Sequence, residues 1–122
     1  MTARGGTATI ATMPGPGARA GGRGIVNRMA PHDLTLRAFQ RHIADRYEST
    51  DRARGTPKTF LWFIEEVGEL ATALNKDDRA NLEEEFADVV AWLCTLANIN
   101  DVDLAAAVER KYLGADRPEG TK

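Results

Sequence analysis

Two short groups of acidic residues are the part of this 122-residue sequence best suited to chemistry. In the first group, Glu66 and Glu69 are three residues apart, with Glu65 beside them. In the second, Glu85 and Asp88 have the same spacing. Residues three apart lie on one face of an α-helix, so each group would present a pair of carboxylates on one side of its helix.

The two pairs are placed symmetrically about Asp77, which lies in a polar stretch that we expect to be a turn. If the flanking helices fold back on each other as an antiparallel hairpin, both pairs lie at the same distance from the turn. The four carboxylates would then converge. Four like charges repel unless a cation neutralises them. An oxygen-only ligand set without His or Cys suits Mg²⁺, with Mn²⁺ as a substitute. The sequence therefore predicts a metal site formed by the two acidic pairs.

Two local features accompany the first acidic pair. Glu65 and Glu69 form a like-charge pair four residues apart, and Gly68 costs a helix about 1 kcal/mol relative to Ala. A sequence that accepts both costs in one place is usually accommodating a site or a close helix contact. The alternative interpretation is that the acids form a solvated helix face. A di-iron carboxylate bundle is disfavoured, because neither His32 nor His42 stands three residues after a glutamate.

Apolar residues at helical spacing predict two helices ahead of the turn. The first begins at Thr35 and is followed by a polar stretch from Glu48 to Gly55. The second carries the first acidic pair. It begins with Thr56 as its N-cap and Pro57 in its first turn, where the missing N–H of proline costs nothing.

Two more helices are predicted after the turn. The third carries the second acidic pair and opens at Asn81, which has capping-box spacing to Glu84. The fourth runs from Leu104 to Leu113, with Asp103 as its cap and Gly114 at its end. Because no segment alternates with the period of a strand, the predicted fold class is all-α: a compact four-helix protomer with a central antiparallel helix hairpin.

The charge of the chain divides unevenly at residue 30. Residues 1–30 carry four Arg and no acid, a net charge of +4, whereas the remainder carries 12 bases and 18 acids, a net charge of −6. An acidic domain disfavours nucleic acid as a partner. Because residues 1–30 also hold seven of the 11 glycines, we expect a disordered extension there, with Met13 or Met29 as the natural start. We expect the helical domain over 31–118 and a tail over 119–122.

The apolar segments and the single cysteine bear on where the protein works. No apolar run approaches the roughly 20 residues that cross a bilayer, so we expect a soluble protein with no membrane partner. Cys94 is the only cysteine and cannot form an intramolecular disulfide or a zinc cluster. A chain of this kind depends on a packed core and suits a reducing compartment, so we expect it in the cytoplasm.

The acidic motifs resemble those of the MazG-like all-α nucleoside triphosphate pyrophosphohydrolases, which are related to dCTP pyrophosphatase, dimeric dUTPase and phosphoribosyl-ATP pyrophosphatase. The resemblance rests on Glu-Glu-x-x-Glu at Glu65–Glu69, followed after a short turn by Glu-x-x-Asp at Glu85–Asp88. Flanking segments also look like compact members of the family, over residues 59–64, 81–92 and 102–112.

The resemblance implies Mg²⁺-dependent hydrolysis of a nucleoside or deoxynucleoside triphosphate to the monophosphate and pyrophosphate, a reaction suited to housecleaning of the nucleotide pool. In the family, the carboxylates that match Glu66, Glu69, Glu85 and Asp88 bind the metal. Oligomerisation completes the helical bundle around the nucleotide. Since residues 31–122 supply only a small core, we expect a homodimer or a dimer of dimers.

Four further residues are candidates for the site. The resemblance implies that Glu65 acts as a base or an outer ligand. Lys111 matches a family lysine that reaches phosphate. Lys76 and Arg79 are phosphate-binding candidates from their position alone, and solvated surface bases are the alternative interpretation.

Two departures from the family leave the preferred base open. Some relatives have an asparagine where this chain has Ala115, and the deoxycytidine-specific branch has a base-contacting tryptophan where this chain has Asn75-Lys76. Trp62 and Trp92 stand at helical spacing beside Phe and Val, so we expect them in the core or an interface rather than on a base. The second hypothesis for the chain is a non-catalytic helical oligomer, a nucleotide-binding regulator or an assembly module, that retains an acidic cluster.

Overall fold

The computed structural model describes residues 34–115, so the expected extension over 1–30 and the expected tail over 119–122 lie outside the described residues. No strand occurs among the described residues, which confirms the all-α class. The elements, in chain order, are α3 (Leu36–Arg54), α4 (Thr56–Ala73), α5 (Arg79–Ile99), α6 (Leu104–Val108) and the π-helix η3 (Glu109–Leu113).

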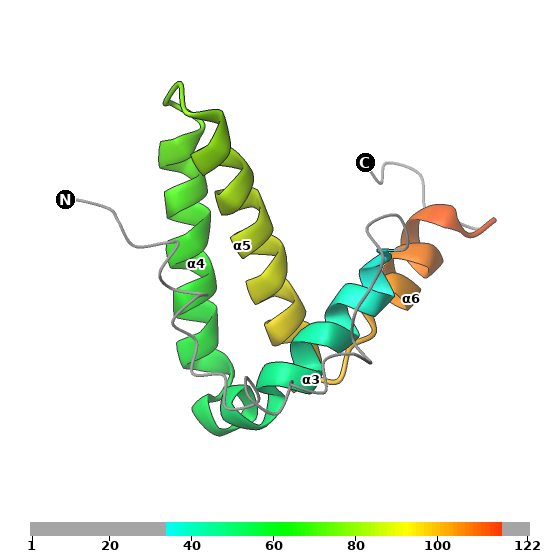
Figure 1. The fold of residues 1–122 in the computed structure, drawn as a ribbon. Helices are drawn as coiled ribbons and strands as arrows, with labels where there is room; N and C mark the ends of the chain where they lie inside the picture. The colour runs from blue at the N-terminus through cyan, green and yellow to red at the C-terminus, as the bar shows by residue number, and fades with distance from the viewer. Residues whose placement is uncertain (1–33, 116–122) are drawn as a thin grey trace.

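The helices form two arms (Figure 1). In one arm, α4 and α5 lie side by side and are joined by the short turn that follows Leu74. In the other arm, α3 packs against α6, and η3 continues from α6. α5 packs against both α4 and α3, so it connects the two arms.

The first helix is longer than the sequence pattern predicted. The helix was predicted to begin at Thr35, and Thr35 is its N-cap, since Oγ1 accepts a 3.0 Å hydrogen bond from the backbone N–H of Ala38. The polar stretch from Glu48 to Gly55 was expected to lie outside a helix, and this was wrong, because α3 continues to Arg54. Ion pairs within the helix stabilise its last turns: Arg52 pairs with Glu48 at 2.6 Å and Arg54 with Asp51 at 2.7 Å.

Two predicted N-caps were wrong in position. α4 is capped by Gly55, whose φ of 89° lets the chain pass directly from α3 into α4. The side chain of Thr56 instead accepts a 3.1 Å hydrogen bond from Asn100. α5 is capped by Asp78 rather than Asn81, and the Asp78 carboxylate accepts a 3.1 Å hydrogen bond from the backbone N–H of Asn81.

The last predicted helix is divided into two kinds of helix. Asp103 caps it as expected, accepting a 3.1 Å hydrogen bond from the backbone N–H of Ala106. The α-helical part ends at Val108, and the remaining residues to Leu113 form a π-helix. Gly114 follows the last helical residue, as predicted, with an extended backbone.

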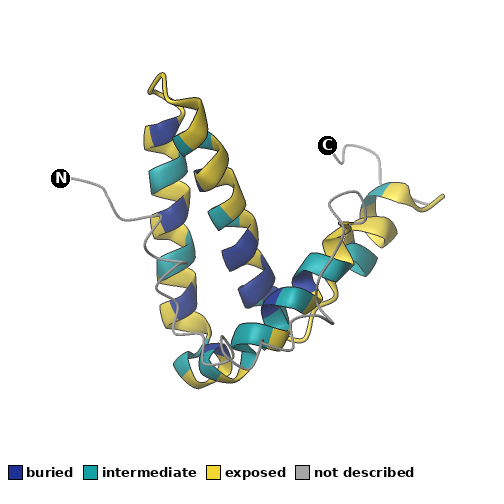
Figure 2. Ribbon diagram, in the orientation of Figure 1, coloured by how far each residue is buried: buried dark blue, intermediate teal, exposed yellow. Residues whose placement is uncertain are grey.

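The apolar core is small and lies where α3, α5 and α6 meet. Three buried residues, Ile43, Ala91 and Cys94, form its centre, and the half-buried Phe39, Tyr47 and Leu104 pack around them. By contrast, α4 and α5 leave many apolar side chains exposed (Figure 2). These exposed apolar residues of α4 and α5 are Phe60, Leu61, Ile64, Val67, Phe86, Val90 and Leu93.

Within residues 34–115, no helix taken singly has both the length and the apolar character to span a bilayer. One pair of segments, α5 with the stretch from Leu104 to Leu113, meets those two criteria together, although it is bent by 97°.

Candidate metal centre

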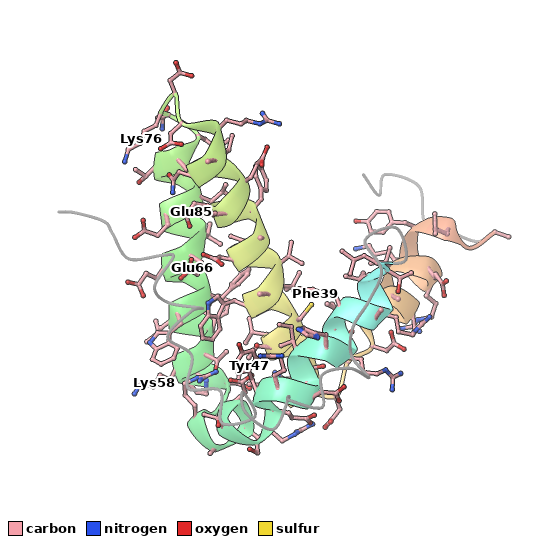
Figure 3. The ribbon with its side chains drawn as sticks, in the orientation of Figure 1. Phe39, Tyr47, Lys58, Glu66, Lys76 and Glu85 are labelled. Carbon is pink, nitrogen blue, oxygen red and sulfur yellow. The ribbon has the colours of Figure 1, made fainter. Side chains whose placement is uncertain are left out.

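Three of the four predicted carboxylates come together between α4 and α5. Glu66 on α4 and Glu85 and Asp88 on α5 each offer an oxygen, and these oxygens all lie within 4.8 Å of one another. Figure 3 shows Glu66 and Glu85 in the space between the two helices. Glu66 is 0% exposed and Glu85 is 3% exposed, so two of the carboxylates are removed from solvent.

The buried side of α4 explains how Glu66 reaches this position. The buried residues of α4 are Thr59, Glu66 and Ala73, which follow one another at intervals of seven and therefore share one face of the helix. These residues are polar or small, whereas the larger apolar residues of α4, such as Phe60 and Ile64, are exposed. The most buried stripe of α4 is thus centred on a carboxylate rather than on a large apolar side chain.

Burial and neighbouring negative charges raise the pKa values of two of the carboxylates, Asp88 and Glu85. Burial raises the pKa of Asp88 to about 7, with further contributions from the negative charges of Glu85 and Glu84. Burial also raises the pKa of Glu85, and the charges of Glu69 and Glu84 act in the same direction. The hydrogen bond from Asn81 and the positive charge of Lys76 partly oppose that rise. The cluster therefore favours a bound proton or a bound cation.

The hydrogen bonds of the cluster leave acceptor oxygens available. Asn81 Nδ2 donates a 3.2 Å hydrogen bond to Glu85 Oε1. Within residues 34–115, the buried atoms Glu85 Oε2 and Asp88 Oδ2 accept no hydrogen bond. Buried carboxylate oxygens without a donor are costly unless a proton or a cation satisfies them. A hard divalent cation, which prefers oxygen ligands, fits this donor set.

The remaining acidic candidates lie next to the cluster. Glu69 is half-buried and does not belong to the group of oxygens within 4.8 Å, although its charge acts on Glu85. Glu65 is exposed on α4. Glu69 as a ligand and Glu65 as a base or outer ligand both stay predictions.

The three cationic candidates occupy different places. Lys76 lies in the turn between α4 and α5, beyond Glu85, and its charge acts on that carboxylate (Figure 3). Arg79 is exposed and pairs with Glu83 at 2.9 Å. Lys111 lies on η3 in the other arm, where its Nζ is 5.5 Å from the centroid of the Tyr112 ring. The fold does not bring Lys111 to the carboxylates of its own chain.

Asn81 has a role that the sequence pattern did not predict. Its capping-box spacing predicted a helix cap, whereas the side chain of Asn81 donates a hydrogen bond to Glu85. The four-residue spacing between the two residues, which places them on one helix face, could have indicated this contact. For Trp92 the expectation of core packing is confirmed, since it is 0% exposed and its ring meets Trp62 edge to face.

Gly68 faces open space in the protomer. A Cβ atom added at this position would meet nothing within 4 Å among the described residues. The close helix contact that its sequence position suggested is therefore not formed inside residues 34–115.

Comparison with known proteins bears on the segment that contains this cluster. None of the curated proteins matches the chain. One protein family does match, over residues 55–112, a range that includes α4, α5, α6 and nearly all of η3. Its description is "MazG nucleotide pyrophosphohydrolase domain", and the match is consistent with a MazG-like family.

Proposed function

We propose that this protein is a Mg²⁺-dependent nucleoside triphosphate pyrophosphohydrolase that releases the nucleoside monophosphate and pyrophosphate. The observation that carries the proposal is the convergence of Glu66, Glu85 and Asp88 at the interface of α4 and α5, within a MazG domain. A carboxylate cluster of this kind suits a substrate whose phosphates bind divalent cations.

In this proposal the carboxylates of Glu66, Glu85 and Asp88 hold the ion, and Glu69, one turn from Glu66, adds a fourth. A bound Mg²⁺ would neutralise charge on the triphosphate and lower the pKa of a coordinated water. The protein's own part is to hold the ligands together and to exclude bulk water from them. The burial of Glu66 and Glu85 supports that role.

The other candidate residues act on the substrate rather than on the ion. Glu65, exposed beside the cluster, is proposed to accept the proton of the attacking water. Lys76 and Arg79, at the turn end of the same arm, are proposed to bind phosphate oxygens. Lys111 lies on η3, in the other arm from the carboxylates. We therefore assign it to the substrate that is bound by a neighbouring subunit.

An assembly of at least two chains is part of the proposal. In it, α4 and α5 act as an antiparallel helix hairpin that packs against the hairpin of a second chain, in a homodimer or a dimer of dimers. The exposed apolar residues of α4 and α5 support this arrangement, because that much apolar surface favours burial against a partner. The open space at Gly68 would admit the close approach of a second helix or of the nucleotide.

The test is product analysis with the full chain. Canonical, deoxy and oxidised triphosphates are incubated with Mg²⁺ or Mn²⁺, and the products are separated by chromatography. We expect the monophosphate and pyrophosphate in equal amounts from at least one substrate, and no product in the presence of a chelator. Cleavage of none of the triphosphates would refute the proposal and leave the non-catalytic oligomer as the better account.

A further inference from the structure

A buried ion pair lies in the last turn of α3, and its arginine also binds the first turn of α4. Arg54 Nη2 donates a 2.7 Å hydrogen bond to Asp51 Oδ1, and the two side chains are 8% and 2% exposed. The Nε of the same guanidinium donates a 2.9 Å hydrogen bond to Thr59 Oγ1, in the first turn of α4. Arg54 thus fixes the end of α3 against the start of α4.

The same guanidinium also lies against two tryptophans from different helices. Its Cζ is 4.7 Å from the ring centroid of Trp62 on α4 and 5.2 Å from that of Trp92 on α5. The two rings meet edge to face, with their centroids 5.4 Å apart. A planar cation packed on two rings restricts how closely, and at what angle, the two helices approach each other. We call Asp51, Arg54, Thr59, Trp62 and Trp92 the Arg54 cluster.

The register of the helices places the Arg54 cluster next to the carboxylates. Trp62 precedes Glu66 by four residues, and Trp92 follows Asp88 by four residues. Four residues of α-helix rise about 6 Å, so the tryptophans lie one turn from the carboxylates on both helices. Because packed helices move as stiff units over one turn, the separation at the tryptophans determines the separation at Glu66 and Asp88.

We infer that Arg54 is a positioning residue for the metal centre: by holding Trp62 and Trp92 together, it sets the separation at which α4 and α5 present their carboxylates to one ion. The inference rests on the proposed metal site. Arg54 acts through the tryptophans, since its hydrogen bonds go to Asp51 and Thr59. Lysine could not replace it, because an ammonium lacks the planar fork of donors with which Arg54 binds both acceptors.

The test measures Mn²⁺ affinity, by the loss of the free-ion electron paramagnetic resonance signal, in two variants of the full chain. Arg54→Met removes the guanidinium. It also leaves Asp51 buried without its cation, and burial already raises the pKa of Asp51. Asp51→Leu/Arg54→Met removes both charges, a replacement that buried ion pairs often tolerate without loss of stability. Thermal melts of the metal-free proteins monitor the fold.

Lys58→Met is the matched control. Its ammonium also lies over the Trp62 ring, 5.7 Å from the centroid, but it is exposed and reaches only one of the two rings. We expect the double variant to have a melting temperature close to that of the wild type. It should bind Mn²⁺ about tenfold more weakly, which is the usual effect of losing a residue that supports a metal ligand without touching the ion. Lys58→Met should bind as the wild type does.

Two results with the double variant overturn the inference. One is a folded double variant with wild-type Mn²⁺ affinity. The other is a double variant that is unfolded without metal. The Arg54 cluster would then be needed for the stability of the whole fold rather than for the position of the carboxylates. The proposed function fails separately: a wild type that binds Mn²⁺ but cleaves no triphosphate refutes the activity and not the positioning role. A wild type that binds no Mn²⁺ refutes both.

Discussion

Asn81 donates a 3.2 Å hydrogen bond from its side-chain amide to Oε1 of Glu85, one helical turn further along α5. This bond occupies one oxygen of the carboxylate, while Oε2 is buried and accepts no hydrogen bond within residues 34–115. The amide therefore fixes one oxygen of Glu85 and leaves the other available to a cation. Residues that orient a ligand in this way contribute to metal affinity without touching the ion.

Asn81→Ala should weaken Mn²⁺ binding by about tenfold and leave the fold intact. The N-cap of α5 survives the change, because Asp78 accepts its bond from the backbone N–H at position 81. Isothermal titration with Mn²⁺ measures the affinity. Asn75→Ala is the control, since within residues 34–115 the Asn75 amide bonds only to the exposed backbone carbonyl of Ala71 at 3.1 Å. Unchanged affinity in Asn81→Ala would show that the bond does not orient the ligand.

The stability of the metal-free protein should fall as pH rises between about 4 and 7. In the folded state Asp88 holds its proton up to a pKa of about 7, whereas in the unfolded chain it loses that proton near its ordinary value. Between the two values the folded state binds more protons, so raising the pH favours unfolding. Thermal melts in the presence of a chelator measure the effect, and Asp88→Asn should show a shallower decline.

Mn²⁺ affinity should have the opposite pH dependence. The ion must displace the Asp88 proton, so binding should strengthen as the pH rises through 7. Parallel melting curves for the wild type and Asp88→Asn at every pH, together with a pH-independent Mn²⁺ affinity, would contradict this account of Asp88.

Disruption of the exposed apolar residues of α4 and α5 should dissociate the assembly. Phe86 is 50% exposed in the protomer, and Phe86→Glu would place a charge where the second chain is proposed to pack. Light scattering at micromolar concentration should show an oligomer for the wild type and a monomer for the variant. Leu34→Glu, at a residue that is 58% exposed ahead of α3, should leave the mass unchanged. A monomeric wild type would contradict the proposed assembly.

The local pattern of the sequence was enough to predict the helices and the main feature of the site. Spacing of apolar residues gave the α-helical class, and the symmetrical placement of the acidic pairs about Asp77 predicted carboxylates that meet. Glu66, Glu85 and Asp88 do meet, because the turn after Leu74 is short enough to keep the two helices in register.

Contacts between distant residues explain what the sequence pattern could not predict. The polar stretch after Glu48 is helical partly because Arg52 binds the far end of α5, with 2.8 Å and 2.7 Å hydrogen bonds to Asn98 and Asp101. The Arg54 cluster forms because α3, α4 and α5 meet, and the spacing of residues along one helix does not predict such a contact. The separation of Lys111 from the carboxylates likewise follows from the angle between the two arms rather than from its own segment.

The most direct test of the metal-dependent activity compares turnover and Mn²⁺ binding in variants that each lose one acid. Glu69→Gln and Asp88→Asn should lose pyrophosphate release and bind Mn²⁺ far more weakly. Their metal-free melting temperatures should be equal to or above the wild type, because a like charge has left a crowded cluster. Glu83→Gln, whose exposed pair with Arg79 contributes little to stability, should match the wild type in all three measurements. Full Mg²⁺-dependent turnover in Asp88→Asn, or unfolding of that variant, would contradict the account.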